Sequence, residues 1–341
     1  MPGVNILSFQ RALGMSGSPH LLLGNGFSIA CKRDIFLYRA LLAEAGLEAK
    51  CPAARKVFDV FGTTDFEAII QKLEDTAKII PLYDKKLTKA PKRISDDAHC
   101  IREALIRTLT DKHPESPDAI TVEQYRACRR FLFKFKNIYT LNYDLLLYWA
   151  LMQREVDNLA IPCNDGFVQA EDGGEDYVIW EPNQNKQNIF YLHGALHLFD
   201  AKTEVHKYTW VNTGVKLITQ IRKAMDARLF PIFVSEGESS DKLNKIMHNS
   251  YLSRARRSFA NITGDLFIFG HSLAPNDEHI LKLIEKGKLS SIFVGLYDAP
   301  DSKAGKAIVN RANRMATART GRRSSLAVHY FDARSANVWG T

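Results

Sequence analysis

Short apolar runs that end in polar or glycine-containing turns recur along the chain, as expected when strands alternate with helices. One such run, Ile138 to Leu141, predicts a buried strand, and the leucine-rich segment from Leu145 to Gln153 predicts a helix. Asn142, Tyr143 and Asp144 occupy the turn between them. Ligands of α/β sheets bind beyond the carboxyl ends of the strands, so Asn142 and Asp144 are the first candidate site residues.

Asp144 also has a purely structural interpretation, because aspartate is among the residues preferred at the N-cap of a helix. Taken alone, this stretch favours the interpretation of Asp144 as a helix N-cap. A functional role for Asn142 and Asp144 therefore depends on polar turns after other predicted strands.

Further strands are predicted at residues 21–23, 188–192, 231–237, 265–269, 290–296 and 326–331, the last of them as an edge strand. Helical patterns separate most of these strands, including segments at 34–47, 213–229 and 241–260. The alternation predicts an α/β fold that is Rossmann-like and doubly wound, with a mainly parallel sheet and helices on both faces.

Residues 65–135 break the alternation with stretches whose apolar residues lie three or four positions apart. They predict an α-helical insertion that packs beside the sheet as a cover over its crevice, so that residues 1–64 and 136–341 form the Rossmann-type domain. His99 and His113 lie in this insertion without a neighbouring acid or cysteine at metal-ligand spacing, and we expect structural or exposed positions for both. Residues 157–187, rich in Asp, Glu, Gly, Asn and Gln, are expected to form an irregular surface excursion.

The predicted strand at residues 21–23 runs into the glycine turn GNGFSIA, which precedes a helical segment. Gly24 and Gly26 could let the backbone approach a pyrophosphate, and N–H groups at the start of the next helix could bind it. Position 29 is isoleucine, however, so the six-residue dinucleotide-binding fingerprint is incomplete. A simple tight turn is the alternative interpretation.

His193 follows the predicted strand at 188–192, where a histidine can act as a general base because its ordinary pKa is about 6.5. A buried histidine with a backbone partner is the alternative. His197 could share a helix face with His193, but the segment HGALH lacks the glutamate that metalloproteases place beside the first histidine. The sequence therefore predicts no metal site.

The composition is that of a soluble globular protein, since 45% of the 341 residues are hydrophobic and 25% are charged. No apolar run reaches the roughly 18 residues that suggest a membrane span, and the N-terminus lacks the pattern of a secretory signal. The five cysteines lie far apart and form no CxxC pair. A disulfide framework and a structural zinc site are therefore not expected, and a reducing cytoplasm is the predicted location.

The formal net charge of +8 would attract polyanions, and arginines gather near the end of the chain at positions 311, 314, 319, 322 and 323. Nucleic-acid binding is one interpretation. These arginines lack interleaved exposed aromatic residues, so a solvated face or an acidic partner is favoured. A bound anionic dinucleotide would also account for a local positive field.

Four elements, GNGFS, TLNYD, YLHG and GHSL with a downstream Asn-Asp pair, stand in this order along the chain. Their order and spacing resemble the sirtuin, or SIR2-like, superfamily, whose sheet binds NAD through GAG-type, TQN-D-type, HG and GTSL-type segments. The resemblance covers residues 20 to 300, apart from the helical insertion. The segments DFEAII and PIFVSEG are similar to those of the divergent bacterial SIR2-like proteins.

The resemblance implies that Asn142, His193 and Asp144 are catalytic. Asn142 and Asp144 would lie around the nicotinamide ribose, and His193 would be the base. Phe36 would cover the nicotinamide, although the family's PDFR signature is absent from this chain. The residues that would contact the dinucleotide are Gly24, Asn25, Gly26, Phe27, Ser28, Gly270, His271, Ser272, Asn276, Asp277 and Tyr297.

Protein-deacetylating sirtuins carry a zinc module with two CxxC pairs between the HG and GTSL segments, whereas residues 194–269 of this chain contain no cysteine. A SIR2-like sequence without this zinc module resembles the NAD-hydrolysing effectors of bacterial anti-phage systems. This implies that NAD+ is a substrate, hydrolysed without a metal to nicotinamide and ADP-ribose. Such an activity has to be held inactive in a healthy cell, so we expect control by homo-oligomerisation or by a sensor or activator protein. The helical insertion or the basic C-terminal region would be the contact surface.

Three alternatives stay open. An NAD-dependent protein deacylase or ADP-ribosyltransferase would use a protein nucleophile in place of water. A non-catalytic sensor would bind NAD or ADP-ribose and pass the signal to a partner. A nucleic-acid binder would use the basic carboxyl end, and its affinity would fall steeply with added salt.

Overall fold

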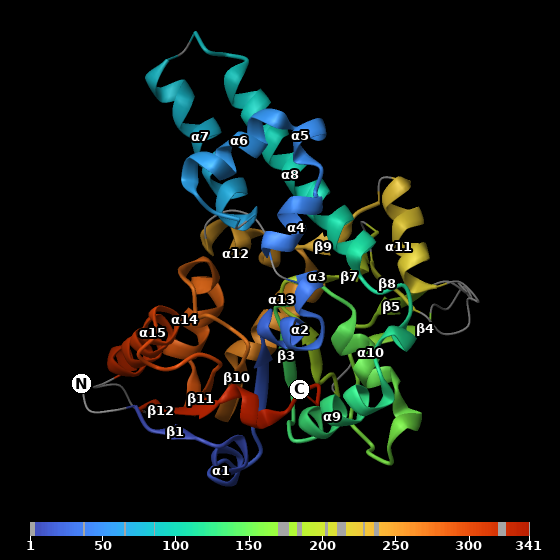
Figure 1. The fold of residues 1–341 in the computed structure, drawn as a ribbon, viewed down its shortest axis with the longest axis vertical. Coiled ribbons are helices and arrows are strands. Elements are labelled where there is room, and N and C mark those ends of the chain that lie inside the picture. The colour runs from blue at the N-terminus through green and yellow to red at the C-terminus, as the bar shows by residue number, and fades with distance from the viewer. Residues whose placement is uncertain are drawn as a thin grey trace.

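The computed structural model describes residues 4–36, 38–64, 66–84, 86–169, 177–182, 186–201, 204–209, 216–227, 229–234, 239–319 and 325–340. A parallel sheet with helices on both faces forms the body, and a group of helices projects from it as an arm (Figure 1). No helix in these ranges is long and apolar enough to cross a membrane.

Seven strands of the described chain form the main sheet, and every neighbouring pair in it is parallel. In spatial order they are β1 (Ile6–Leu7), β12 (Ala327–Asp332), β11 (Lys288–Leu296), β10 (Thr263–Phe269), β2 (His20–Leu23), β3 (Ile138–Thr140) and β6 (Ile189–Tyr191). The predicted α/β fold with a parallel sheet is confirmed. The expectation that the strand at 326–331 lies at the edge is wrong, because β1 pairs with β12 and takes that position.

The helices complete the α/β alternation. The α-helices of the described residues are α1 (Phe9–Gly14), α2 (Gly26–Cys31), α3 (Arg33–Phe36), α4 (Tyr38–Glu44), α5 (Leu47–Lys50), α6 (Pro52–Phe61), α7 (Phe66–Tyr83), α8 (Ala90–Lys112), α9 (Val122–Leu132), α10 (Leu146–Met152), α11 (Leu217–Asp226), α12 (Ser239–His248), α13 (Ser250–Ala260), α14 (Glu278–Lys286) and α15 (Lys303–Arg319). Short 3-10 helices are η1 (Pro117–Ala119), η2 (Arg154–Val156), η3 (Pro275–Asp277) and η4 (Ala333–Ala336).

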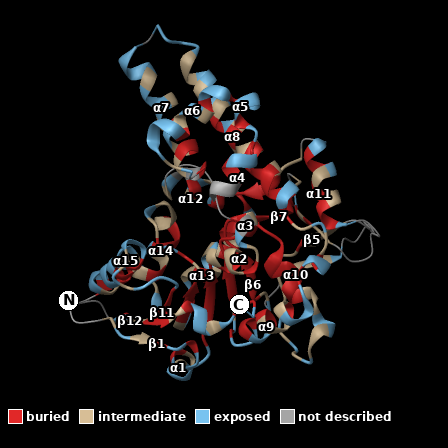
Figure 2. Cartoon of the chain, viewed as in Figure 1, coloured by how far each residue is buried: buried red, intermediate tan, exposed pale blue. Residues whose placement is uncertain are grey.

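Helices cover both faces of the main sheet, as expected for a doubly wound fold. On one face Phe259 of α13, Ile280 of α14 and Val309 of α15 form a core with the strand residues Leu22 and Ile268. Helices α1, α9 and α10 bury their apolar sides in the core of the other face. The strands are continuous apolar runs because both of their faces are buried (Figure 2).

The order of the strands defines a crevice. From β2 the chain proceeds through β3 to β6 in one direction, and from β10 through β11 to β12 in the other. β2 and β10 are neighbours, so the switch in direction falls between them. In doubly wound sheets ligands bind at such a switch point, beyond the carboxyl ends of the strands.

Helices α5 to α8 form the arm, in which α7 and α8 pack along each other (Figure 1). Helix α9 instead packs beside α10 in the body. A disulfide joins Cys51, which precedes α6, to Cys100 of α8. No disulfide framework was expected from the spacing of the cysteines. One disulfide nevertheless forms, because the packing of the arm brings together two cysteines that are 49 positions apart.

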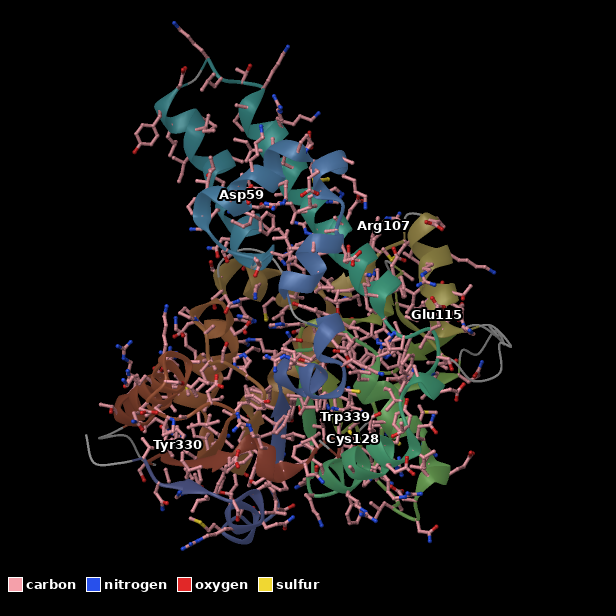
Figure 3. All side chains as sticks on the ribbon, in the orientation of Figure 1. Asp59, Arg107, Glu115, Cys128, Tyr330 and Trp339 are labelled. Atoms are coloured by element: carbon pink, nitrogen blue, oxygen red, sulfur yellow. A yellow bond between two sulfur atoms is a disulfide. The ribbon has the colours of Figure 1, made fainter. Side chains whose placement is uncertain are left out.

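Ion pairs attach the lower end of α8 to α11. Arg107 on α8 pairs with Asp226 at 3.1 Å, and Arg222 on α11 pairs with Glu115 at 2.6 Å (Figure 3). His113, the C-cap of α8, is a buried structural residue, as expected. Its Nε2 accepts the N–H of Leu145 at 3.0 Å, and burial lowers its pKa to about 4.

A second sheet with five described strands is antiparallel. In spatial order it contains β4 (Phe167–Gln169), β5 (Tyr177–Trp180), β8 (Val205–Tyr208), β7 (Gly194–Asp200) and β9 (Pro231–Phe233). The expectation of an irregular excursion over residues 157–187 is therefore wrong, because β4 and β5 lie there. The last part of the strand predicted at 231–237, residues 235–237, lies outside the described residues.

Two predicted helices differ in the structure. His197 lies on β7, so it does not share a helix face with His193. The segment 241–260 contains two helices, because Asn249 interrupts it and caps α13 by accepting the N–H of Leu252 at 3.0 Å.

The expected basic face near the carboxyl end is partly neutralised. Arg319 is buried and donates to the carbonyl oxygen of Leu289 at 2.7 Å, and Arg311 pairs with Glu278. The arginines at positions 322 and 323 lie outside the described residues. This region therefore offers less free positive charge than the sequence predicts.

Candidate functional site

Three glycines bring two turns into contact at the switch point. The N–H of Gly24 donates to Phe269 O at 2.9 Å, and the N–H of Gly26 donates to Gly270 O at 2.8 Å. A Cβ on Gly26 would lie 2.5 Å from the Cα of Gly270, and Gly270 itself has a φ of +71°. Glycine is therefore required at these positions for the two turns to touch, independently of any ligand.

The start of α2 uses its N–H groups within the protein. Those of Phe27, Ser28 and Ile29 donate to carbonyl oxygens of the turn that precedes the helix. The ring of Phe27 is fully buried and packs against Trp339, with 5.1 Å between the ring centroids. A pyrophosphate near this turn would consequently need other donors than the N–H groups that the sequence suggested.

A buried chain of hydrogen bonds orients Asn142. Its Nδ2 donates to Ser28 Oγ at 2.9 Å, and the Ser28 hydroxyl donates to Asp144 Oδ2 at 2.5 Å. Asp144 Oδ1 accepts the N–H of Leu146 at 2.9 Å, at the start of α10. Burial raises the pKa of Asp144, while these two hydrogen bonds oppose the rise. The N-cap of α10 is Leu145, so the interpretation of Asp144 as the N-cap is wrong by one residue. The Asp144 carboxylate instead accepts the first N–H of the helix and holds the amide of Asn142 through Ser28.

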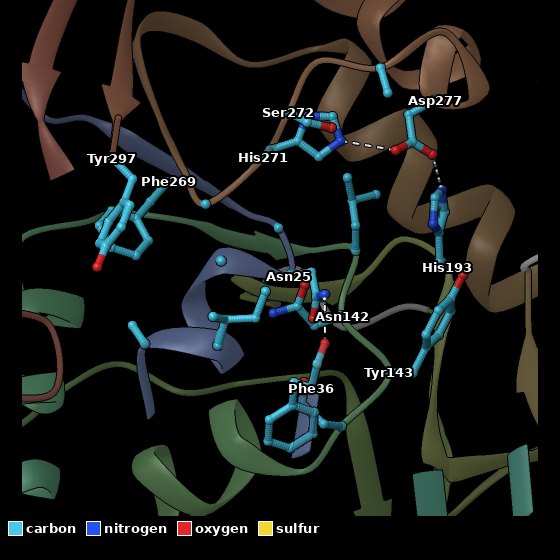
Figure 4. A pocket seen from close by; sticks show the side chains of 18 of the residues that line it. Asn25, Phe36, Asn142, Tyr143, His193, Phe269, His271, Ser272, Asp277 and Tyr297 are labelled. Carbon is cyan, nitrogen blue, oxygen red and sulfur yellow. Dashed lines mark hydrogen bonds and ion pairs between the residues drawn. The ribbon is translucent and has the colours of Figure 1, made fainter. Parts of the chain in front are cut away.

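A cavity of about 970 Å³ opens beyond these turns, a volume at the upper end of the usual range for small-molecule and cofactor sites. Asn142 and His193 face this cavity from the ends of β3 and β6 (Figure 4). Of the predicted site residues, Phe27 and Ser28 are outside its lining. Those that line it are Gly24, Asn25, Gly26, Asn142, Asp144, His193, Gly270, His271, Ser272, Asn276, Asp277 and Tyr297.

The helices on the arm side contribute the facing wall of the cavity. It is largely apolar and contains Leu41 of α4, Ala68 and Gln71 of α7, and Leu105 and Leu109 of α8. The polar groups gather on the opposite side, at the strand ends. The cavity therefore pairs one apolar wall with one that can form hydrogen bonds.

Phe36 also lines the cavity, between the glycine turn and the arm. Its carbonyl oxygen accepts Nδ2 of Asn25 at 3.0 Å, and its ring meets His113 edge-on at 5.9 Å. These contacts fix the phenyl ring beside the strand-end residues.

His193 lies where the main sheet passes into the second sheet. Strand β7 begins at Gly194, which has a φ of +84° and where a Cβ would lie 2.0 Å from Ile232 O in β9. The carbonyl oxygen of His193 accepts the N–H of Val234 at 3.0 Å. The pairing of β7 with β9 therefore requires the glycine of the His-Gly pair and fixes the backbone of His193 at the cavity.

The ring of His193 belongs to a buried group that we call the histidine cluster, formed by His193, Lys242, His271, Asp277 and His279. Nε2 of His193 lies 2.9 Å from Nε2 of His279. It lies 3.9 Å from Asp277 Oδ1 (Figure 4). Nδ1 of His271 accepts a backbone N–H at 3.0 Å, so its Nε2 carries the proton donated to Asp277 Oδ2 at 2.9 Å. Lys242 Nζ lies 3.3 Å from Asp277 Oδ1.

Two imidazoles of the cluster, those of His193 and His279, are held neutral beside an ionised carboxylate. Burial lowers the pKa of His193 well below 6.5 and the pKa of His279 to about 4. Burial would raise the pKa of Asp277, but the hydrogen bond from His271 and the neighbouring Lys242 bring it well below its ordinary range. A neutral His193 can accept a proton, and the carboxylate would stabilise the imidazolium that forms.

Ligand atoms of His193, Asp277 and His279 lie within 4.8 Å of one another, a spacing at which they could hold a metal ion. Imidazole and carboxylate groups suit several divalent metals. Lys242 is fully buried, however, and already places its ammonium group beside Asp277. The positive charge that Asp277 requires is thus supplied by the chain itself.

Four cationic or titratable groups of this site were not predicted from the sequence. Arg33 and Arg334 line the cavity, and the guanidinium carbon of Arg334 lies 4.3 Å from the ring centroid of Tyr297. Arg334 follows the last strand of the sheet, a signal that could have pointed to it. Lys242 and His279 come from α12 and α14, and no local motif marks them.

A protein-family model described as "Domain of unknown function (DUF4917)" matches residues 21–339. The match covers most of the chain and includes the strand ends, the glycine turns and the histidine cluster. A search of curated proteins returns no match. The description of the family specifies no activity, so the function has to be argued from the site.

Proposed function

The chain belongs to the DUF4917 family, and from the geometry of its cavity we propose that it is an NAD+ hydrolase of the SIR2-like kind. It would cleave the bond between nicotinamide and ribose and release nicotinamide and ADP-ribose. One observation carries the proposal: Asn142 and His193, from two separate strand ends, line the same cavity.

Cleavage of this bond requires mainly that the protein position the ribose and the incoming water. The nicotinamide ring is cationic in NAD+, so it leaves as a neutral molecule with little need for protonation, and positive charge spreads onto the ribose. One N–H of the Asn142 amide is engaged by Ser28. Its carbonyl oxygen and second N–H would orient a ribose hydroxyl or the incoming water.

His193 would act as the general base. It would accept a proton from a ribose hydroxyl or from the attacking water, a contribution commonly worth about 10²–10⁴-fold in rate. The Asp277 carboxylate, 3.9 Å from Nε2, would stabilise the positive charge that develops on the ring. His279, 2.9 Å away, would hold the ring in one orientation.

The remaining polar groups suit the rest of a dinucleotide. Arg33 and Arg334 could neutralise the pyrophosphate, because guanidinium groups form strong bidentate hydrogen bonds to phosphate. Tyr297 is exposed and stacks with Arg334, so it offers an aromatic face for adenine. Ser272 and His271 would lie near the ribose of the same half.

The activity would need control, since continuous hydrolysis would drain cellular NAD. We place that control in self-assembly or in a sensor or activator protein, as in bacterial anti-phage defence. NAD turnover by the purified chain should accordingly change with protein concentration or on addition of the products of neighbouring genes.

Variants of the two central residues test the proposal. Asn142→Ala and His193→Ala should each reduce nicotinamide release by about 100-fold or more, because each removes a group that acts on the reacting sugar. Asn261→Ala and His248→Ala are matched controls at exposed positions and should retain full turnover. Thermal melting should show all four variants folded.

Undiminished turnover in both Asn142→Ala and His193→Ala would contradict the assignment. Labelled NAD that produces modified protein in place of free ADP-ribose would select an ADP-ribosyltransferase. Tight NAD binding without turnover in any assembly state would select a nucleotide sensor.

A further inference from the structure

The outer end of the arm exposes apolar side chains. Ile79, Leu82 and Tyr83 at the end of α7 and Leu87 after the turn are 49%, 80%, 87% and 50% exposed. They are four of the eleven large apolar side chains found exposed among the described residues. We call the segment that contains these four residues, residues 78–93, the arm tip.

Three of the exposed apolar residues of the arm tip lie on the same face of one helix. Ile79, Leu82 and Tyr83 are spaced three and four positions apart, so they lie on one face of α7. None of them belongs to either hydrophobic core. In Figure 2 the arm is buried near the body and exposed toward its outer end. The tip therefore presents an apolar surface that the described chain does not cover.

Basic residues are frequent in the same segment. Residues 78–93 contain six lysines and arginines and one acidic residue, of which Lys78 pairs with Asp75 at 3.8 Å and Lys85 lies outside the described residues. Lys86, Lys89, Lys92 and Arg93 are exposed around the turn. The single acid, Asp84, accepts the backbone N–H of Lys86 at 2.8 Å and so belongs to the turn itself. Exposed apolar side chains in the same segment as exposed basic residues fit an anionic, partly apolar partner.

We propose that the arm tip docks onto the surface of a lipid bilayer that contains anionic lipids. A bilayer offers an apolar layer for Leu82 and Tyr83 beneath negatively charged headgroups for the lysines. The tip projects beyond the rest of the molecule, and side chains there extend away from the ribbon (Figure 3). The cavity at the strand ends includes no residue of the tip. Such a projecting end can enter a lipid surface without a matching groove.

The position of the tip leaves the cavity free. Helix α7 contacts the cavity through Ala68 and Gln71 and carries Leu82 at its other end, about 20 Å further along the helix axis. The docked protein would therefore contact the membrane through its arm, and the body with its cavity would remain in water. The inference does not depend on the reaction proposed for the cavity.

Co-sedimentation of the full chain with vesicles tests this inference. The chain should bind vesicles of phosphatidylcholine mixed with phosphatidylserine and should not bind phosphatidylcholine alone. The double variants Leu82→Ser with Tyr83→Ser, and Lys86→Glu with Lys89→Glu, should each weaken binding by about tenfold or more. All four side chains are exposed, so the fold should persist, as thermal melting would verify.

Matched controls lie elsewhere on the surface. Val122→Ser with Phe133→Ser removes exposed apolar residues from the ends of α9, and Lys306→Glu with Arg314→Glu reverses exposed charges on α15. Both should bind the mixed vesicles like the parent chain. Equal loss in the controls, or no binding to mixed vesicles, would overturn the proposal.

Two further outcomes would identify another occupant and equally reject the bilayer. Unchanged vesicle binding by the Leu82→Ser, Tyr83→Ser variant would mean that the tip is a general polyanion site. Binding to polyglutamate, without binding to mixed vesicles, would indicate an acidic protein.

Discussion

At the scale of single residues, the site depends on partners that hold Asn142 and His193 in place. Ser28 does not line the cavity, yet its hydroxyl connects the amide of Asn142 to the carboxylate of Asp144. His193 is held in the same way, with its ring beside His279 and its backbone paired with β9. Residues behind the cavity are therefore as important to the geometry as those that face it.

The buried position of His193 predicts the pH dependence of the proposed NAD cleavage. A base with a lowered pKa is neutral above that pKa and loses its lone pair only as the pH falls through it. We expect kcat/KM to stay constant from about pH 8 to about pH 6 and to decline only at lower pH. Measurement of nicotinamide release across this range checks the prediction. A decline centred near 6.5 would mean that the base is a solvated histidine.

The sequence indicated some of these residues and could not indicate others. Asn142 and His193 each follow an apolar run that predicts a strand. The rule that ligands of α/β sheets bind beyond the carboxyl ends of the strands therefore identifies both residues. Lys242 and His279 lie on helices whose patterns are those of ordinary amphipathic elements. Only the tertiary packing of α12 and α14 brings their side chains to Asp277.

At the scale of elements, the two glycine turns are the most tightly constrained part of the crevice. The sequence suggested that Gly24 and Gly26 leave space for a pyrophosphate. In the structure the missing Cβ atoms leave space for the turn after β10. The packing of two strand-to-helix turns, which one segment of sequence cannot reveal, accounts for the difference.

Alanine substitutions can measure this packing. Gly270→Ala would combine an unfavourable φ with a Cβ only 2.6 Å from the N atom of Phe27, so we expect a loss of about 3 kcal/mol or more in the free energy of unfolding. Gly264→Ala has a similar φ of +77° but no atom within 4 Å, so about 1 kcal/mol is expected. Urea unfolding of both variants gives the comparison. Equal losses would show that the turns do not require the close contact.

Strands with continuous apolar runs were predictable, whereas those of the second sheet were partly missed. β4 and β5 are short and lie in a stretch rich in polar residues and glycine, which resembles a loop. The segment HGALH was compatible with a helix by spacing, but it pairs with β9 as the first part of β7. Antiparallel pairing between distant segments leaves little local signal.

At the scale of the whole molecule, the alternation of strands and helices predicted the parallel sheet and the location of the crevice. The projection of the arm and the Cys51–Cys100 disulfide were not predictable, because both depend on helix packing between distant segments. The same arm has an apolar wall at the cavity and a basic, apolar tip at its outer end. The proposed reaction and the proposed docking would therefore lie at opposite ends of α7.

The most direct test of the central claim is mass spectrometry of the products formed from NAD+ in ¹⁸O-labelled water, with and without candidate activating partners. Hydrolysis at the cavity predicts equal amounts of nicotinamide and ADP-ribose, with one ¹⁸O atom on the ribose carbon that held nicotinamide. Recovery of intact NAD+ at every protein concentration and with every partner, or ADP-ribose without the label, would contradict the account.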